Sequence, residues 1–261
     1  MKQILTTAIF LIGPAAAFAQ DETIGVRLRE WYVKMEGEVE SDGATLNAGE
    51  IDLDATLGLD DRETAHEIQA YVDFPILGKF YAGAWWVRSE GDHTLNQNVT
   101  FDDQTFTAST TVESEIDLKC YYASYEFSFP VIPLGDLISA EVGILAGVRV
   151  LDVAGSIQAA GQSASDEGII GTPVVGVHGS VRILEWIRAD AEIMGLGLSY
   201  SGRSGRYIEA YGEVVVTPAP WVFAGVGYKY VDVFVKEEND PQQFEIDITL
   251  SGFYLTAGVR F

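Results

Sequence analysis

The stretch that decides the fold is Glu67-Ile68-Gln69-Ala70-Tyr71-Val72-Asp73-Phe74. Every even position in it is apolar, and every odd position carries an acid, an amide or a phenol. Side chains alternate between the two faces of a β-strand, so this stretch predicts a strand with one apolar and one polar face. The same alternation returns at 140–150, 175–183 and 187–193. A wall of such strands faces lipid on one side and a polar interior on the other.

About ten stretches of this kind follow one another along the chain. We place them at 25–40, 64–75, 79–90, 111–129, 138–154, 168–183, 186–200, 205–217, 221–236 and 243–261. The connectors alternate between compact turns and mostly longer polar loops, as the periplasmic and extracellular ends of a bacterial barrel do. The sequence therefore predicts an all-β fold, a transmembrane antiparallel up-and-down β-barrel of about ten strands, with roughly eight to twelve possible. A soluble β-sandwich is the alternative.

Two strands change the parity of their apolar residues. Ile116, Leu118 and Cys120 share one face of 111–129, whereas Tyr125 and Phe127 have the opposite parity. The last strand changes in the same way near residue 252. A β-bulge would cause such a change, and so would a strand that extends beyond the bilayer, where its outer face need not be apolar.

The N-terminal residues are typical of a secretory signal peptide. Lys2 precedes a short apolar run at 4–12, Pro14 ends it, and Ala17-Phe18-Ala19 supplies the small residues of a cleavage site. The apolar run is too short to span a bilayer as a helix. We expect residues 1–19 to be removed and residues 20–261 to form one barrel domain.

The composition excludes several functions. The chain of 261 residues has 39 acidic and 16 basic residues, and its net charge of −23 disfavours binding to nucleic acid. Cys120 is the only cysteine, so an intramolecular disulfide and a thiolate zinc site are excluded. We expect Cys120 to be a small apolar filler, and no motif indicates a cofactor.

The C-terminal strand resembles the signal by which bacterial outer-membrane proteins are recognised and inserted. Phe253, Leu255, Ala257, Val259 and the terminal Phe261 occupy one face. The chain is similar over its whole mature length to the broad superfamily of outer-membrane β-barrels. That resemblance implies an outer-membrane location, a monomer in contact with membrane lipid and lipopolysaccharide, and recognition of the last strand by the barrel-assembly machinery.

Charged residues of both signs recur on the polar faces of the strands. Interlocked charges usually fill the interior of a narrow barrel, although a narrow path for cations is the alternative. The predicted lumen network comprises Lys34, Glu67, Asp73, Glu141, Arg149, Arg182, Arg188, Asp190, Glu209, Glu213, Lys229 and Arg260.

One group of residues has the composition of a nucleophilic site. His178 and Ser180 share a face of one strand, and Glu192 lies on the next. The spacing is similar to that of the outer-membrane lipid A 3-O-deacylases, and the resemblance implies His178 as base, Ser180 as nucleophile and Glu192 as the orienting carboxylate. The alternative is that all three belong to the charged lumen network.

The first long loop concentrates acidic residues, among them Asp52, Asp54, Asp60 and Asp61. Carboxylate oxygens suit divalent cations such as Ca²⁺, but solvated acidic loops are the commoner case. We expect a non-enzymatic barrel, either a plugged scaffold or a narrow, cation-preferring conduit. A surface adhesin and a lipid-modifying hydrolase are the other two classes that the sequence leaves open.

Overall fold

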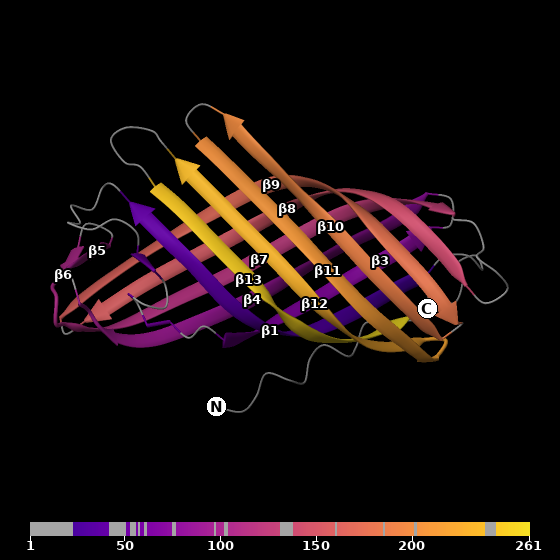
Figure 1. Ribbon diagram of the computed structural model, residues 1–261, viewed down its shortest axis with the longest axis horizontal. Coiled ribbons are helices and arrows are strands. Elements are labelled where there is room, and N and C mark those ends of the chain that lie inside the picture. Colours follow the sequence, from indigo (N-terminus) through magenta and orange to yellow (C-terminus); the bar gives the residue numbers. More distant parts are fainter. Residues whose placement is uncertain are drawn as a thin grey trace.

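Ten long antiparallel strands form one closed barrel in the computed structural model of the chain (Figure 1). The structure describes residues 23–41, 51–52, 56, 58–59, 62–74, 77–96, 98–101, 104–130, 138–159, 161–184, 186–200, 203–237 and 244–261. The predicted all-β, transmembrane up-and-down barrel is confirmed. The predicted signal peptide at 1–19 lies outside the described residues. Within the described ranges, no helix is long and apolar enough to cross a membrane.

The wall follows the order of the sequence, so each long strand pairs with the strands before and after it. The strands are β1 (Thr23–Ser41), β3 (Arg62–Phe74), β4 (Gly78–Thr94), β7 (Thr111–Pro130), β8 (Ser139–Ala159), β9 (Gln162–Leu184), β10 (Ile187–Tyr200), β11 (Arg203–Ala219), β12 (Val222–Glu237) and β13 (Phe244–Arg260). Pairing of β13 with β1 closes the ring, and Ile24 and Phe261 exchange two backbone hydrogen bonds of 3.0 and 2.8 Å.

Three short strands lie in stretches that the sequence predicts as loops. β2 (Ile51–Asp52) pairs with the end of β1, while β5 (Val99–Phe101) and β6 (Gln104–Phe106) form a small hairpin. The strands predicted at 138–154 and 168–183 leave residues 155–167 as a loop, and this prediction is wrong, since β8 and β9 continue through most of that stretch. They meet in a tight turn at Gly161, whose φ of 87° is a left-handed conformation that glycine adopts without strain.

The two ends of the barrel differ. We name the end where β3 meets β4, β9 meets β10 and β11 meets β12 the turn end; it lies on the right in Figure 1, with the C-terminus. The opposite end, which carries β5 and β6, is the loop end. Near the turn end the outward-facing side chains are apolar, as Leu28, Ile144 and Leu255 show with half or more of their surface exposed.

Towards the loop end the strands invert their polarity. On β7 the even residues face the lumen throughout, but they are polar at Ser124 and Glu126 and apolar at Ile116 and Leu118. The pairing of β7 with both neighbours is continuous, so no bulge causes the change of parity. The strands instead extend beyond the apolar band, where the outer face meets water and the lumen holds the apolar side chains.

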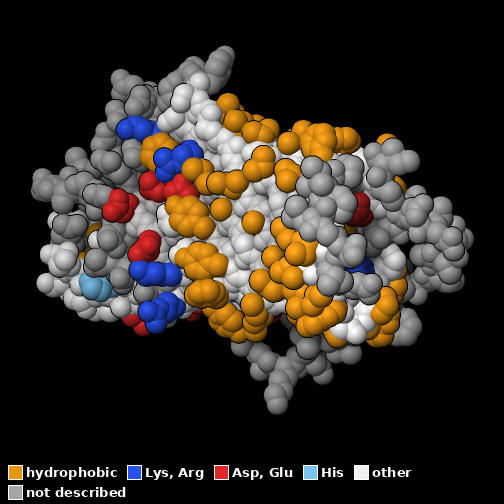
Figure 2. Space-filling model, turned by 45° about the vertical axis from the view of Figure 1, so that its right-hand side comes forward, with side chains coloured by type: hydrophobic (Ala, Val, Ile, Leu, Met, Phe, Trp, Pro, Cys, Tyr) orange, Lys and Arg blue, Asp and Glu red, His pale blue; other side chains and the backbone are white. Residues whose placement is uncertain are grey.

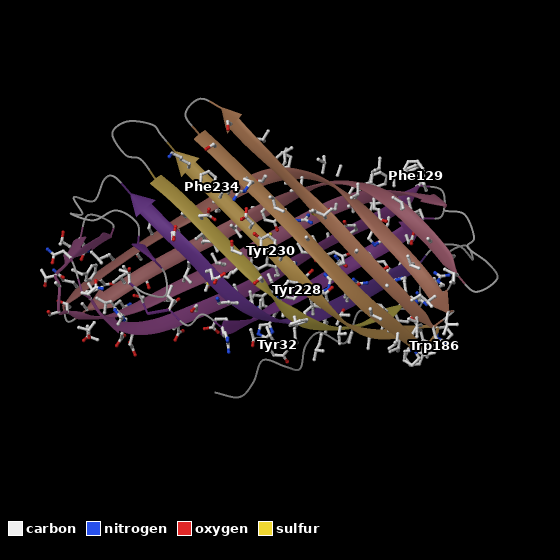
Figure 3. All side chains as sticks on the ribbon, viewed as in Figure 1. Tyr32, Phe129, Trp186, Tyr228, Tyr230 and Phe234 are labelled. Atoms are coloured by element: carbon white, nitrogen blue, oxygen red, sulfur yellow. The ribbon has the colours of Figure 1, made fainter. Side chains whose placement is uncertain are left out.

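The surface shows the same division. In Figure 2 hydrophobic side chains form a band over the middle and right of the molecule, and charged side chains gather on the left. Phe129 and Trp186 lie near the turn end, whereas Tyr32, Tyr228 and Tyr230 lie near the middle of the long axis (Figure 3). Aromatic rings of this kind mark the two edges of the lipid-facing band in outer-membrane barrels. The strands of up to 23 residues therefore cross the bilayer and continue past it.

Candidate functional site

A polar cavity of about 210 Å³ occupies the lumen near the turn end. Its wall carries both signs of charge, with His178, Ser180 and Glu192 among the lining residues. Seven residues of the predicted lumen network also line it: Asp73, Glu141, Arg182, Arg188, Asp190, Glu213 and Arg260. Glu141 and Arg182 are exposed, so the cavity reaches the turn end of the barrel.

On the loop-end side of the cavity, a continuous chain of buried ion pairs crosses the lumen. We name this set the ionic layer; in order of contact it runs Arg27, Glu213, Arg29, Glu67, Lys229, Glu209 and Arg149. Lys229 Nζ lies 3.1 Å from Glu67 Oε2 and 3.0 Å from Glu209 Oε1. The chain starts on β1 and ends on β8, which is nearly opposite β1 in the ring. Charges of alternating sign therefore bridge the full width of the lumen.

Tyrosine hydroxyls donate further hydrogen bonds to the three carboxylates of this layer. Tyr122 donates to Glu67 at 2.5 Å, Tyr207 to Glu209 at 2.9 Å, and Tyr254 to Glu213 at 3.0 Å. A buried carboxylate is tolerated only when its charge is paired and its oxygens accept hydrogen bonds. These three carboxylates meet both conditions, so the layer is a filled structure and not an open polar path.

An apolar layer lies next to the ionic layer, on its loop-end side. Trp31 and Trp85 are each 1% exposed and pack edge to face, with ring centroids 6.1 Å apart. The ammonium of Lys229 lies 5.3 and 5.9 Å from these two rings, which joins the layers through cation–π contacts. Further buried side chains complete the layer: Val33, Met35, Val87, Ile116, Leu118, Cys120, Leu151, Val231, Val233, Ile246, Ile248 and Leu250.

A smaller apolar cluster closes the loop end on the side of β8 and β9. Phe106 of the β5–β6 hairpin is fully buried and packs with Ile157 and Ala164. Gln104 Nε2 donates to the backbone oxygen of Ser163 at 2.8 Å, which ties the hairpin to β9. Ionic layer, apolar layer and hairpin cluster thus follow one another from the middle of the lumen towards the loop end.

The three residues of the hypothetical nucleophilic site lie on one cavity wall but are not linked as a relay. His178 Nδ1 lies 2.8 Å from Glu126 Oε1, and His178 Nε2 lies 3.9 Å from Asp190 Oδ1. Glu192 instead accepts hydrogen bonds of 3.3 and 3.4 Å from Tyr81 and Tyr211. Within the described part of the chain, no hydrogen bond joins Ser180 to His178 or Glu192. The nearest carboxylate partner of His178 is therefore Glu126.

The structure separates the predicted lumen residues into three groups. Lys34 lies outside the lumen, since it faces outward on β1 and pairs with exposed Glu36; its polar character reflects the water-facing part of that strand. Glu67, Arg149, Glu209, Glu213 and Lys229 lie in the ionic layer, and the other six predicted residues line the cavity.

The predicted metal candidates are only partly covered by the structure. Asp54, Asp60 and Asp61 lie outside the described residues, and nothing is described of the Asp52 side chain. Among the side chains that the structure does describe, no group of three or more His, Cys, Asp and Glu residues could hold a metal ion.

The lumen network predicted from the sequence did not include Arg27, Arg29 and Glu126, although the alternation of polar and apolar residues places each of them on a polar face. Arg27 and Arg29 alternate with Val26 and Leu28, which is the same period-two pattern that placed Glu67 in the lumen. Glu126 alternates with the aromatic residues of β7. Each of the three is buried and forms a salt bridge in the lumen.

Comparisons with known proteins point to one fold. No protein-family model matches the chain, and no curated protein sequence matches it. The outer membrane protease OmpT from Escherichia coli is similar in structure, with a TM-score of 0.53 and 12% identity over 93% of this chain and 96% of OmpT. The Ail attachment invasion locus protein of Yersinia pestis gives a TM-score of 0.37 and 11% identity over 92% of this chain and 99% of its own. The likeness to OmpT concerns the fold alone, and this chain has the fold of bacterial outer-membrane β-barrel proteins.

Proposed function

We propose that this protein is a closed, non-enzymatic outer-membrane barrel, a plugged scaffold that holds the loop-end parts of its strands outside the bilayer. The observation that carries the proposal is the pair of stacked layers in the lumen. The ionic layer reaches from β1 to β8, and Trp31 and Trp85 cover it at 1% exposure each. A path for ions would have to cross both layers, and side chains at native packing density leave no room for hydrated ions.

The charges of the lumen argue against a cation-preferring conduit. A selective path needs carboxylates that face moving ions. Glu67, Glu209 and Glu213 each lie within 3.1 Å of a cationic side chain. Their charges are therefore already neutralised by the protein.

The loop-end surface is the part that would meet other molecules. Outward-facing charges occur there on neighbouring strands, as Arg88 contacts both Glu90 and Glu115. With the loop end outside the cell, this rim would be exposed to binding partners, which keeps the adhesin class as a second candidate. The turn end would then face the periplasm, with lipid and lipopolysaccharide around the wall, a monomeric state, and Phe253, Leu255, Val259 and Phe261 presented to the assembly machinery.

The hydrolase class has weaker support. The side chain of His178 contacts Glu126, and the cavity that Ser180 lines opens at the turn end, which this proposal places in the periplasm and not at the outer leaflet. An unchanged mass of lipid A on overexpression would agree with the proposed scaffold, whereas loss of an acyl chain would support hydrolysis and identify Ser180 for substitution.

The experiment that tests the scaffold is planar-bilayer recording from the refolded full-length protein. Folding is first verified by the slower gel migration of the denatured chain, and a porin in the same membrane shows that channels are detectable. We expect no steady conductance from the folded barrel. Reproducible cation-selective steps would contradict the proposal.

A further inference from the structure

β9 and β10 separate on their way to the loop end. Their pairing runs from Leu184–Ile187 at the turn end only as far as Val175–Gly195. β9 continues to Gln162 and stays paired with β8, while β10 continues to Tyr200 and stays paired with β11. In Figure 1 the two strands run apart towards the left. The ladder between them is therefore open beyond Val175 and Gly195, and we name this region the lateral gap.

The sequence of β9 suits an open edge. Pro173 lies two residues beyond Val175, the last paired residue, in the direction of the loop end. Proline has no backbone N–H to donate, and in a sheet it is confined to edges and bulges. Nearer the loop end, Asp166 and Glu167 add charge, which discourages pairing with a foreign strand. These features disfavour a peptide strand as the occupant of the lateral gap.

The outer border of the gap belongs to the lipid-facing band. The outward positions of β9 next to the gap are Ile169, Gly171, Pro173 and Val175, and Ile169 is 75% exposed. On β10 the outward positions are Gly195 and Gly197. None of these residues is charged, so membrane lipid can approach the gap from outside.

The inner border of the gap is mostly apolar, with Thr172 as the polar residue between Val174 and Ile170. Val174 and Met194 are buried at its base, and Ile170 packs against the apolar layer of the lumen. Leu196 and Leu198 continue the lumen-facing side of β10, yet Leu198 is 52% exposed. A side chain added at Gly168, which has the same parity as Val174, would meet no atom within 4 Å. Mostly apolar side chains thus border the open ladder on its outer side and on its lumen-facing side.

We propose that the lateral gap is a binding site for one alkyl chain of a lipid from the outer leaflet. An alkyl chain matches the mostly apolar character of both borders, and the gap is continuous with the lipid-facing outer surface of β9. Burial of the chain against Ile170, Leu196 and Leu198 would remove apolar surface from water, at about 0.8 kcal/mol for each CH₂ group.

The test is photolabelling in membranes. The full-length barrel is refolded into phosphatidylethanolamine–phosphatidylglycerol vesicles that contain a phosphatidylcholine with a diazirine within one acyl chain. Irradiation is followed by mass spectrometry of the labelled peptides. We expect label on lumen-facing Leu196 and Leu198 as well as on outward Ile169. Label confined to outward residues such as Ile169, Val175 and Ile193 would overturn the proposal.

Two glycines of β9 provide matched variants. Gly168 faces the lumen and Gly171 faces outward, and a side chain at either position would meet no atom within 4 Å. Gly168→Phe is expected to occupy the lumen-facing side of the gap and abolish label on Leu198, while Gly171→Phe leaves that label unchanged. Equal loss in both variants would contradict a site inside the gap, provided that both still migrate as folded barrels.

Two further outcomes would assign the gap to another occupant. Label on Leu198 from a water-soluble diazirine fatty acid, but not from the phospholipid, would show entry from the aqueous side and reject the lipid source. Covalent dimers linked through β9 would show that a second copy fills the gap, and would likewise reject the lipid.

Discussion

Replacement of Lys229 by methionine tests the ionic layer at its centre. Lys229 is 1% exposed and lies about equally close to Glu67 and Glu209, at 3.1 and 3.0 Å. Methionine keeps most of the side-chain volume but removes the charge. Glu67 then retains Arg29, and Glu209 retains Arg149, but the two carboxylates lose the cation between them. Loss of one partner from a buried pair costs about 3–5 kcal/mol, and we expect Lys229→Met to fall in that range.

The assay is urea unfolding of the refolded barrel in lipid vesicles, followed by gel migration. Removal of the opposing charge should restore part of the loss, and Glu67→Gln is the suitable second change because Arg29 still has Glu213 at 3.7 Å. We expect the Lys229→Met/Glu67→Gln double variant to be more stable than the sum of the single effects, with a coupling of about 0.5–3 kcal/mol. A single-variant loss below about 0.5 kcal/mol, typical of exposed pairs, would refute the ionic layer, as would strict additivity.

Three further predictions concern the membrane boundary, a close backbone contact and the rim. Ile144→Arg should destabilise the barrel by about 2–4 kcal/mol because position 144 faces the middle of the lipid band, whereas Ser156→Arg, outward on the same strand but beyond the band, should have almost no effect in the same urea assay. Gly252→Ala should lower stability by about 1–3 kcal/mol, since a Cβ there would lie 1.9 Å from a backbone oxygen of β1, and Gly168→Ala, where the Cβ meets no atom within 4 Å, is its control. Arg88→Met should leave the urea midpoint unchanged, because its salt bridges are exposed and screened by water; a clear shift would show that the rim contributes to folding.

The strands could be predicted from sequence because their period is local. The alternation at Glu67–Phe74 needs no knowledge of the neighbours, and the ten predicted strands match the ten long strands of the barrel. The parity change in 111–129 was also visible, but the sequence alone left both a bulge and an extension beyond the bilayer open. The continuous pairing of β7 decides for the extension.

The inversion of polarity explains why Lys34 was misplaced. In the lipid-facing band a polar residue points into the lumen, but beyond the band a polar residue points to water. Lys34 lies in the second region of β1, whereas Arg27 and Arg29 lie in the first. The position along a strand where polar side chains change from the lumen to the outer face depends on how the strands lie in the bilayer. The local sequence pattern does not contain that information.

The partners in the ionic layer could not be predicted either. Arg27 and Glu213 are 186 positions apart and lie 2.7 Å from one another. Which residues meet across the lumen depends on the stagger of ten strands round the ring, because a small shift in register changes every cross-lumen neighbour. The charge composition of the lumen was therefore predictable, and its pairing was not.

Native Cys120 offers the most direct measurement of the closed lumen. It is the only cysteine, it lies in the apolar layer, and it is 0% exposed. The unmodified protein in vesicles is treated with a small, charged, membrane-impermeant thiol reagent, added outside or trapped inside, and the urea-unfolded chain gives the full rate. A plugged lumen predicts no reaction of the folded barrel from either side. Rapid reaction from one side or both would show that water reaches the apolar layer, and would contradict the plugged lumen.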